Sequence, residues 1–226
     1  MTPMLPAGLG RRASLLGVTG WLVAATAHAQ APKTNSDESV AQTQNQQDAM
    51  GGLVTEDLLH DATSPVLGNR DGDVTMVEFF DYRCPYCKVM APRLTALIGR
   101  DPGLRLVMKE YPVLSRESIF AAKVALIAAR HGVYAGFHKA MFGLSGQLDD
   151  QKTLQVAQSV GLSNDAVRAE LGDREIAAEL RRNLALGQLI GVRGTPAFIV
   201  DRGITPGAVA TEVLAKMVED ARKKPK

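Results

Sequence analysis

Hydrophobic residues in the middle of the chain follow first a strand-like and then a helix-like pattern. Residues 74–80 are β-branched or aromatic at almost every position, which predicts a strand buried on both faces. From residue 85 to residue 99 the apolar residues recur at helical spacing, and residues 104–111 predict a second strand. The expected inward face of the helix carries Val89, Met90, Leu94, Leu97 and Ile98. A turn-rich stretch at 64–72 is predicted to precede this strand–helix–strand unit.

The stretch from about residue 115 to residue 190 is predicted to be almost entirely helical. Apolar residues such as Ile119 keep helical spacing along it. Three glycines divide it into three or four expected helices: Gly132, Gly146 and Gly161. These helices are therefore expected to form an insertion between the strands of a sheet.

Strand-like and helical patterns return in the last 30 residues. A strand is predicted at 197–200, and a further short strand is expected after a turn near Gly203. An amphipathic helix at 208–222 closes the chain. Its inward face is expected to carry Val209, Val213, Leu214, Met217 and Val218. The whole order of elements predicts an α/β protein with an inserted helical subdomain.

The first 29 residues have the features of a signal peptide. A basic pair, Arg11 and Arg12, precedes an apolar run over residues 13–27, and small residues surround Ala29. The run is shorter than the roughly 20 residues that a membrane-spanning helix needs, so an uncleaved anchor is the less favoured alternative. The paired arginines also resemble a twin-arginine export signal, and the export route stays open. The sequence thus predicts a periplasmic protein that loses residues 1–29.

A polar segment and one domain are predicted to follow the signal. Residues 30–52 are rich in Gln, Asn, Ser and Asp and predict a flexible linker, with a short oligomerising helix at 39–49 as a weakly supported alternative. Residues 53–226 suffice for one core and are predicted to form one domain. The formal net charge of +2 disfavours nucleic acid or an anionic membrane as the main partner. No other apolar run predicts stable membrane insertion.

Candidate chemistry is concentrated in the two cysteines, Cys84 and Cys87, which begin the helix predicted after the first strand. Unpaired N–H groups and the positive end of the helix dipole stabilise a thiolate at this position. Cys84 is therefore the predicted nucleophile, and Cys87, one turn into the helix, is the predicted resolving thiol. Pro85 occupies the first helical turn, where the N–H that proline lacks is not needed.

Two simpler explanations of the cysteine pair are less favoured. Half of a structural zinc site is one, but the chain has no second cysteine pair, and His60, His131 and His138 lack ligand spacing. A structural disulfide is the other, but so short a loop removes little entropy from the unfolded chain. No cofactor or metal is expected, and thiol–disulfide exchange is the favoured chemistry.

Two motifs together resemble the DsbA-like branch of the thioredoxin-fold proteins. Residues 77–88, Val-Glu-Phe-Phe-Asp-Tyr-Arg-Cys-Pro-Tyr-Cys-Lys, are similar to the active-site strand and helix start of that branch. Gly194-Thr195-Pro196 resembles the cis-proline loop that faces the cysteines in this fold. The long helical stretch between the motifs matches the insertion of the branch, and the resemblance covers about residues 65–216. It implies a thioredoxin fold with an inserted helical subdomain.

The resemblance also implies roles for residues outside the cysteine pair. Pro196 is expected to follow a cis peptide bond, and the backbone of Thr195 is expected to pair with a substrate chain beside Cys84. Tyr86 is expected to contact the same substrate. Glu78 corresponds to the family's buried acidic residue, suited to exchanging a proton with Cys87, and Lys109 is expected to be its charge partner.

The direction of exchange stays open at this point. The Pro-Tyr pair between the cysteines and Thr195 before Pro196 resemble ScsC-like and DsbG-like members, which leaves oxidase, isomerase and reductase as alternatives. The expected partners are exported proteins with cysteines and a membrane oxidase or reductase that resets the pair. A copper chaperone or a redox-inert binding protein of the same fold is the alternative from another functional class. An isomerase would need an oligomer, for which residues 30–52 give little support.

Overall fold

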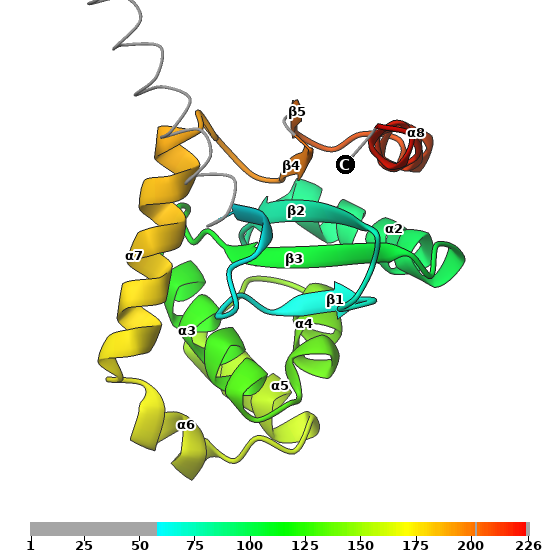
Figure 1. Ribbon diagram of the computed structural model, residues 1–226. Helices are drawn as coiled ribbons and strands as arrows, with labels where there is room; N and C mark the ends of the chain where they lie inside the picture. The colour runs from blue at the N-terminus through cyan, green and yellow to red at the C-terminus, as the bar shows by residue number, and fades with distance from the viewer. Residues whose placement is uncertain (1–57, 202, 225–226) are drawn as a thin grey trace, which may run out of the picture. The chain divides into compact units, whose positions relative to one another are not determined.

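The computed structural model describes residues 58–201 and 203–224 (Figure 1). The predicted signal peptide at 1–29, the linker at 30–52 and its alternative helix at 39–49 lie outside these residues. All described residues belong to one compact unit of the chain. The expected single domain is described below from residue 58 onward.

A five-stranded sheet runs through the described residues in the order β1-β3-β2-β4-β5. The central strands β2 and β3 are parallel, while β1 pairs antiparallel with β3, and β4 pairs antiparallel with both β2 and β5. In Figure 1 the strands β4, β2, β3 and β1 follow one another down the view. The strands are β1 Val66–Gly68, β2 Val74–Phe80, β3 Leu104–Glu110, β4 Ala197–Val200 and β5 Gly203–Pro206.

Within the described residues, the seven helices α2 to α8 lie around this sheet. Five of them, α3 to α7, lie between β3 and β4, so the helical insertion is confirmed but holds more helices than the three or four predicted. The additional break lies at Asp173, whose side chain accepts hydrogen bonds from the first backbone N–H groups of α7. The helices are α2 Pro85–Arg100, α3 Arg116–Arg130, α4 Tyr134–Gly143, α5 Asp150–Ser159, α6 Asn164–Glu170, α7 Arg174–Leu189 and α8 Thr211–Arg222.

The two faces of the sheet pack against different helices because successive side chains of a strand point to opposite sides. On β2, Met76 and Phe80 belong to the large hydrophobic cluster that also contains residues of α2, α3 and α8. Val77 and Phe79 belong to a smaller cluster with partly buried residues of α7. Gly187 lets α7 approach closely, since a Cβ there would lie 2.5 Å from the ring of Tyr111. Both faces of β2 are therefore buried, as its sequence predicts.

Several local predictions were wrong. Residues 66–68 form the edge strand β1, although the surrounding stretch predicts only turns. Val89 and Val213 were expected to point inward but are exposed, and they extend the apolar faces of α2 and α8 beyond the part that is covered. Leu214 and Val218 on α8 are buried as predicted.

Candidate active site

The two cysteines lie where α2 begins, directly after the carboxyl end of β2. Cys84 is the N-cap residue, with an extended backbone (φ −72°, ψ 117°), and Pro85 occupies the first helical position. The Cys84 Sγ atom accepts a hydrogen bond from the backbone N–H of Cys87 at 3.4 Å. A cap of this kind places the sulfur against the unpaired N–H groups of the helix, where a negative charge is favoured. Cys84 therefore lies at the start of the helix, where the sequence pattern placed it.

Several hydrogen bonds stabilise the anionic form of Cys84. The Cys87 thiol lowers the pKa of Cys84 most, and the Thr195 side chain and the backbone N–H groups of Cys87 and Tyr86 lower it further against the opposing effect of burial. The pKa of Cys84 is accordingly about 6, compared with 9.0 for an unperturbed thiol. A thiolate therefore predominates at Cys84 near neutral pH, which is the state that reacts with disulfides.

Cys87 lies in the opposite environment. Its side chain is fully buried, and both cysteines are free thiols in this structure. Burial raises the pKa of the Cys87 thiol, and the hydrogen bond to Cys84 and the negative charge of Glu78 raise it further. Cys87 is thus a protonated donor to Cys84 in the dithiol form and needs a base before it can act as a nucleophile.

Glu78 lies on β2 beneath the two cysteines. It belongs to the same face as Met76 and Phe80, because residues two apart on a strand share a face, and it is 1% exposed. Burial raises the pKa of Glu78 to about 8, with a smaller contribution from the charge of Cys84. A carboxyl group with this pKa changes its protonation readily near neutral pH.

Lys109 is not the partner of Glu78. In the parallel pairing of β2 with β3, Lys109 lies opposite Phe79 and Glu78 lies opposite Met108, so the two charged side chains leave opposite faces of the sheet. Lys109 instead donates a hydrogen bond to Asp61 at 2.7 Å. The predicted pairing was wrong because the sequence does not reveal that Lys109 meets Asp61, 48 positions away, on the face of the sheet opposite to Glu78.

The segment before β4 faces the cysteine pair. The Thr195–Pro196 peptide bond is cis, which confirms that prediction. The Cys84 thiol donates to the Thr195 carbonyl oxygen at 3.1 Å. Tyr86, 62% exposed, and residues 191–197 line a groove of about 570 Å³ together with the end of β5. Cys84 therefore lies beside a groove that has a backbone segment along one wall.

Asp81 organises the turn between β2 and α2, although the sequence analysis assigned it no role. Its carboxylate accepts hydrogen bonds from the backbone N–H groups of Arg83, Val113 and Leu114 and from the Ser118 hydroxyl, all at 2.7–3.0 Å. Aspartate directly after a buried strand is a common loop-capping residue, which is the signal that was available in the sequence. Asp81 thus joins the redox turn to the loop before α3.

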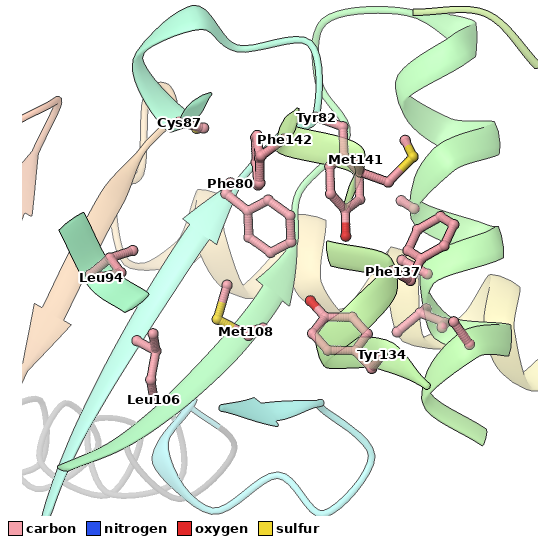
Figure 2. Close-up of a cluster of buried hydrophobic side chains, with 14 of the residues drawn as sticks. Phe80, Tyr82, Cys87, Leu94, Leu106, Met108, Tyr134, Phe137, Met141 and Phe142 are labelled. Carbon is pink, nitrogen blue, oxygen red and sulfur yellow. The ribbon is translucent and has the colours of Figure 1, made fainter. Parts of the chain in front are cut away.

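A group of buried polar side chains lies behind the redox turn. The hydroxyl groups of Tyr82 and Tyr134 donate to the same oxygen of Glu110, at 3.3 and 3.1 Å. Figure 2 shows both hydroxyl groups directed toward one region between the sheet and the inserted helices. His138 Nδ1 lies 3.2 Å from the Tyr82 oxygen, and burial lowers the pKa of His138 to about 3. His138 is therefore a neutral member of an aromatic cluster with Phe80, Tyr82 and Phe142.

The described residues lack two other classes of site. No three His, Cys, Asp or Glu side chains there are grouped in a way that would hold a metal ion. None of the helices within residues 58–201 and 203–224 has the length and apolar character that crossing a membrane requires.

Comparison with solved structures gives matches over most of this domain. A thioredoxin-like oxidoreductase from Silicibacter pomeroyi DSS-3 is 40% identical, with a TM-score of 0.73, over 75% of this chain and 98% of that one. A periplasmic thioredoxin-like protein from Salmonella enterica serovar Typhimurium is 29% identical, with a TM-score of 0.70, over 76% and 97%. The catalytic domain of Proteus mirabilis ScsC is 28% identical, with a TM-score of 0.68, over 75% and 96%. The expected thioredoxin-like fold is thus confirmed.

The curated relatives are longer proteins. Na(+)/H(+) antiporter NhaA 3 of Salinispora tropica is 29% identical over 158 residues, which are 69% of this chain and 24% of the antiporter. The chain therefore spans about a quarter of the length of the curated relatives that it matches, and the match carries no conclusion about ion transport.

A family match agrees with the geometry of the site. The DSBA-like thioredoxin domain matches residues 75–219, which include the cysteine pair, the helical insertion and the cis-proline segment. This range covers more than half of the chain and extends from β2 to α8. The chain belongs to the family of DSBA-like thioredoxin domains.

Proposed function

We propose that this protein is an exported thiol–disulfide oxidoreductase that exchanges the Cys84–Cys87 pair with cysteine-containing proteins. The observation that carries the proposal is the contrast between the two thiols. Cys84 has a pKa of about 6 at a helix N-terminus, whereas burial raises the pKa of Cys87. Cys84 can thus attack a disulfide as a thiolate, and Cys87 stays protonated until it acts as the resolving thiol.

The exchange begins with the Cys84 thiolate. Its sulfur attacks one sulfur of a substrate disulfide, the substrate S–S bond breaks, and the other substrate sulfur leaves as a thiolate. Cys87 then loses its proton and attacks Cys84 Sγ, which breaks the mixed disulfide and releases the second substrate thiolate. Two electrons pass from the protein to the substrate, and the reverse sequence forms a disulfide in the substrate.

Glu78 is proposed to accept the proton of Cys87. The charge of the Cys84 thiolate contributes to the raised pKa of Glu78. When Cys84 enters the mixed disulfide this charge is lost, so the pKa of Glu78 decreases and its carboxylate form becomes more populated. The base is thereby generated at the step that needs it.

The groove beside Cys84 is proposed to hold the substrate chain. The Thr195 carbonyl oxygen lies 3.1 Å from the Cys84 sulfur and accepts its hydrogen bond when Cys84 is in the thiol form, so this backbone group is close to the reacting sulfur. Tyr86 and Pro196 line the same groove and provide an apolar surface for side chains beside the substrate cysteine. The proposal leaves the net direction, disulfide formation or isomerisation, to measurement.

Export to the periplasm is the second part of the proposal. It rests on the basic pair, apolar run and small residues of positions 1–29, and on the similarity to a periplasmic thioredoxin-like protein of Salmonella. A membrane oxidase or reductase that restores the redox state of Cys84 and Cys87 is the partner that this location would provide.

Trapping of the mixed disulfide tests the central claim. Cys87→Ser should accumulate a covalent adduct with a fluorescent peptide disulfide, because no resolving thiol remains, and Cys84→Ser should form none. The unchanged protein should reduce insulin and release the peptide. An adduct at Cys87 in the Cys84→Ser protein, or turnover that survives Cys84→Ser, would refute the assignment. Binding of Cu(I) without any exchange activity would instead favour the copper-chaperone alternative.

A further inference from the structure

A second cavity lies away from the cysteines. It has a volume of about 610 Å³ and lies between the segment 62–65, the end of α3 and the first half of α7. This volume is within the usual range for pockets that bind small molecules. The cavity shares no lining residue with the groove beside Cys84. It is therefore a separate candidate site, with no part in the proposed exchange reaction.

Glu179 of α7 is an acidic lining residue of this cavity that lacks a full set of partners. It is 7% exposed, and its Oε1 atom is buried without a hydrogen-bond partner. The neighbouring cation Lys109 donates instead to Asp61 at 2.7 Å. A buried carboxylate oxygen without a donor costs free energy, which a bound group that supplies a donor would recover. Burial, followed by the charge of Asp61, raises the pKa of Glu179 to about 7.

Two arginines, Arg70 and Arg182, lie on the wall of the cavity, and the charge of Arg182 also acts on Glu179. Among residues 58–201 and 203–224, Arg70 and Arg182 form no ion pair, and Arg182 donates only to the Thr63 hydroxyl at 3.3 Å. Arg130, on the same cavity, differs because it pairs with Glu170, Asp173 and Glu175. The cavity thus has one side that needs a donor and another that offers guanidinium groups.

We propose that this cavity binds a small zwitterion of the amino-acid or dipeptide type, with its ammonium group at Glu179 and its carboxylate at Arg70 and Arg182. An ammonium group supplies the hydrogen bond that Glu179 Oε1 lacks. A carboxylate matches the planar fork of a guanidinium group. Because Glu179, Arg70 and Arg182 all line one cavity, a ligand that carries both charges can contact them from within it.

Titration calorimetry with L-alanyl-L-alanine tests the proposal on the full chain. Saturable binding to one site is expected. The N-acetylated dipeptide lacks the ammonium group and the C-terminal amide lacks the carboxylate, and each should bind at least about tenfold more weakly because it loses a charge-assisted hydrogen bond. Absence of saturable binding at millimolar dipeptide, or equal affinity for all three probes, overturns the proposal.

Variants locate the binding to this cavity. Glu179→Gln and Arg182→Gln should each reduce dipeptide affinity at least about tenfold. Ala178→Leu should abolish binding by filling the cavity while it preserves every charge. Arg181→Gln is the matched control on the same helix, since it removes a neighbouring positive charge at a residue outside the lining of the cavity, and it should bind as the unchanged protein does. If Glu179→Gln fails to fold, Ala178→Leu decides, and unchanged affinity in that variant refutes the site.

The proposed exchange reaction is read out separately. Insulin reduction by Glu179→Gln and Ala178→Leu should match that of the unchanged protein, because neither residue lines the groove beside Cys84. Loss of dipeptide binding with normal exchange supports the second site alone. Loss of exchange together with binding contradicts the separation of the two sites.

Discussion

At the scale of single residues, the site depends on environments that differ over very short distances. Cys84 and Cys87 are separated by two positions, yet hydrogen bonding lowers the pKa of one and burial raises the pKa of the other. The difference arises because Cys84 caps the helix and Cys87 lies within the core. An asymmetric pair of this kind determines which sulfur a substrate meets first.

The pH dependence of alkylation should reveal this asymmetry. The pKa of Cys84 is lowered from 9.0 to about 6, so the rate of its reaction with iodoacetamide should rise to a plateau with a midpoint near pH 6. Cys87 should remain unmodified in the native dithiol form. Mass spectrometry of the quenched protein identifies the modified residue. A midpoint near pH 9, equal to that of an unperturbed thiol, would contradict the account of the helix cap.

Glu78→Gln should increase stability in a manner that depends on pH. The pKa of Glu78 is raised from 4.5 to about 8 in the folded protein, so its contribution to folding is most favourable below pH 4.5 and is lost as the pH rises toward 8. Glu78→Gln should therefore raise the free energy of unfolding more at pH 8 than at pH 4.5. The difference is up to about 5 kcal/mol, since one pKa unit corresponds to about 1.4 kcal/mol.

Urea unfolding of the dithiol forms at both pH values measures this difference. The disulfide form provides an internal comparison, because it lacks the Cys84 charge and the gain from Glu78→Gln should be smaller there. If Glu78→Gln changes the free energy of unfolding by the same amount at pH 4.5 and pH 8, burial does not destabilise the charged form of Glu78.

At the scale of elements, one carboxylate fixes the turn from which α2 begins. Asp81 receives two hydrogen bonds from the loop before α3, one from Ser118 of α3 and one from Arg83. The beginnings of α2 and α3 are thereby joined. Cys84 depends on this arrangement, since its backbone N–H donates to the Asp81 carbonyl oxygen at 3.0 Å.

Asp81→Ala should lower the free energy of unfolding by about 2–4 kcal/mol, because it leaves one buried donor and three partly buried donors without their acceptor. Asp149→Ala is a suitable control, since Asp149 caps α5 with a backbone hydrogen bond from Lys152 and its loss should cost only about 1 kcal/mol. Denaturant titration of both variants gives the comparison. Equal costs for the two variants would show that the Asp81 bonds contribute no more than an ordinary cap.

The elements also show why some of the fold was predictable from sequence and some was not. The strand β2 was predictable because its hydrophobic run is continuous, and the start of α2 because a cysteine pair and Pro85 mark it. The strand β1 has only three residues, so its pairing with β3 supplies the stabilisation that its sequence does not indicate. The break before α7 was missed because Asp173 lies within an otherwise helical sequence.

Within the site, residues that belong to sequence motifs were identified, whereas contacts between residues outside such motifs were not. Cys84, Cys87 and Pro196 belong to recognisable motifs. The ion pair of Lys109 with Asp61 and the convergence of Tyr82 with Tyr134 depend on register and helix packing, which periodicity does not determine. A pairing proposed between neighbouring strands, such as Lys109 with Glu78, is wrong whenever the two residues point to opposite faces.

At the scale of the whole domain, the inserted helices are joined to the sheet by a buried polar contact as well as by apolar packing. Glu110 ends β3, Tyr82 follows β2, and Tyr134 begins α4. Both tyrosines donate to Glu110 Oε1, and the Asn183 side chain of α7 donates to the Glu110 carbonyl oxygen at 3.3 Å. Burial raises the pKa of Glu110 well above its usual value. Because a buried acceptor of this kind requires its donors, the hydrogen bonds of Glu110 connect the sheet to both α4 and α7.

A double-mutant cycle with Tyr82→Phe and Tyr134→Phe should show that the two donors are coupled. Each single variant leaves Glu110 with one donor and should cost about 1 kcal/mol, whereas the double variant leaves the buried oxygen with neither. The double variant should therefore be less stable than the sum of the single effects by about 0.5 kcal/mol or more. Urea unfolding at constant pH supplies the four free energies. Strict additivity would mean that the tyrosines act independently, and that apolar packing alone joins the insertion to the sheet.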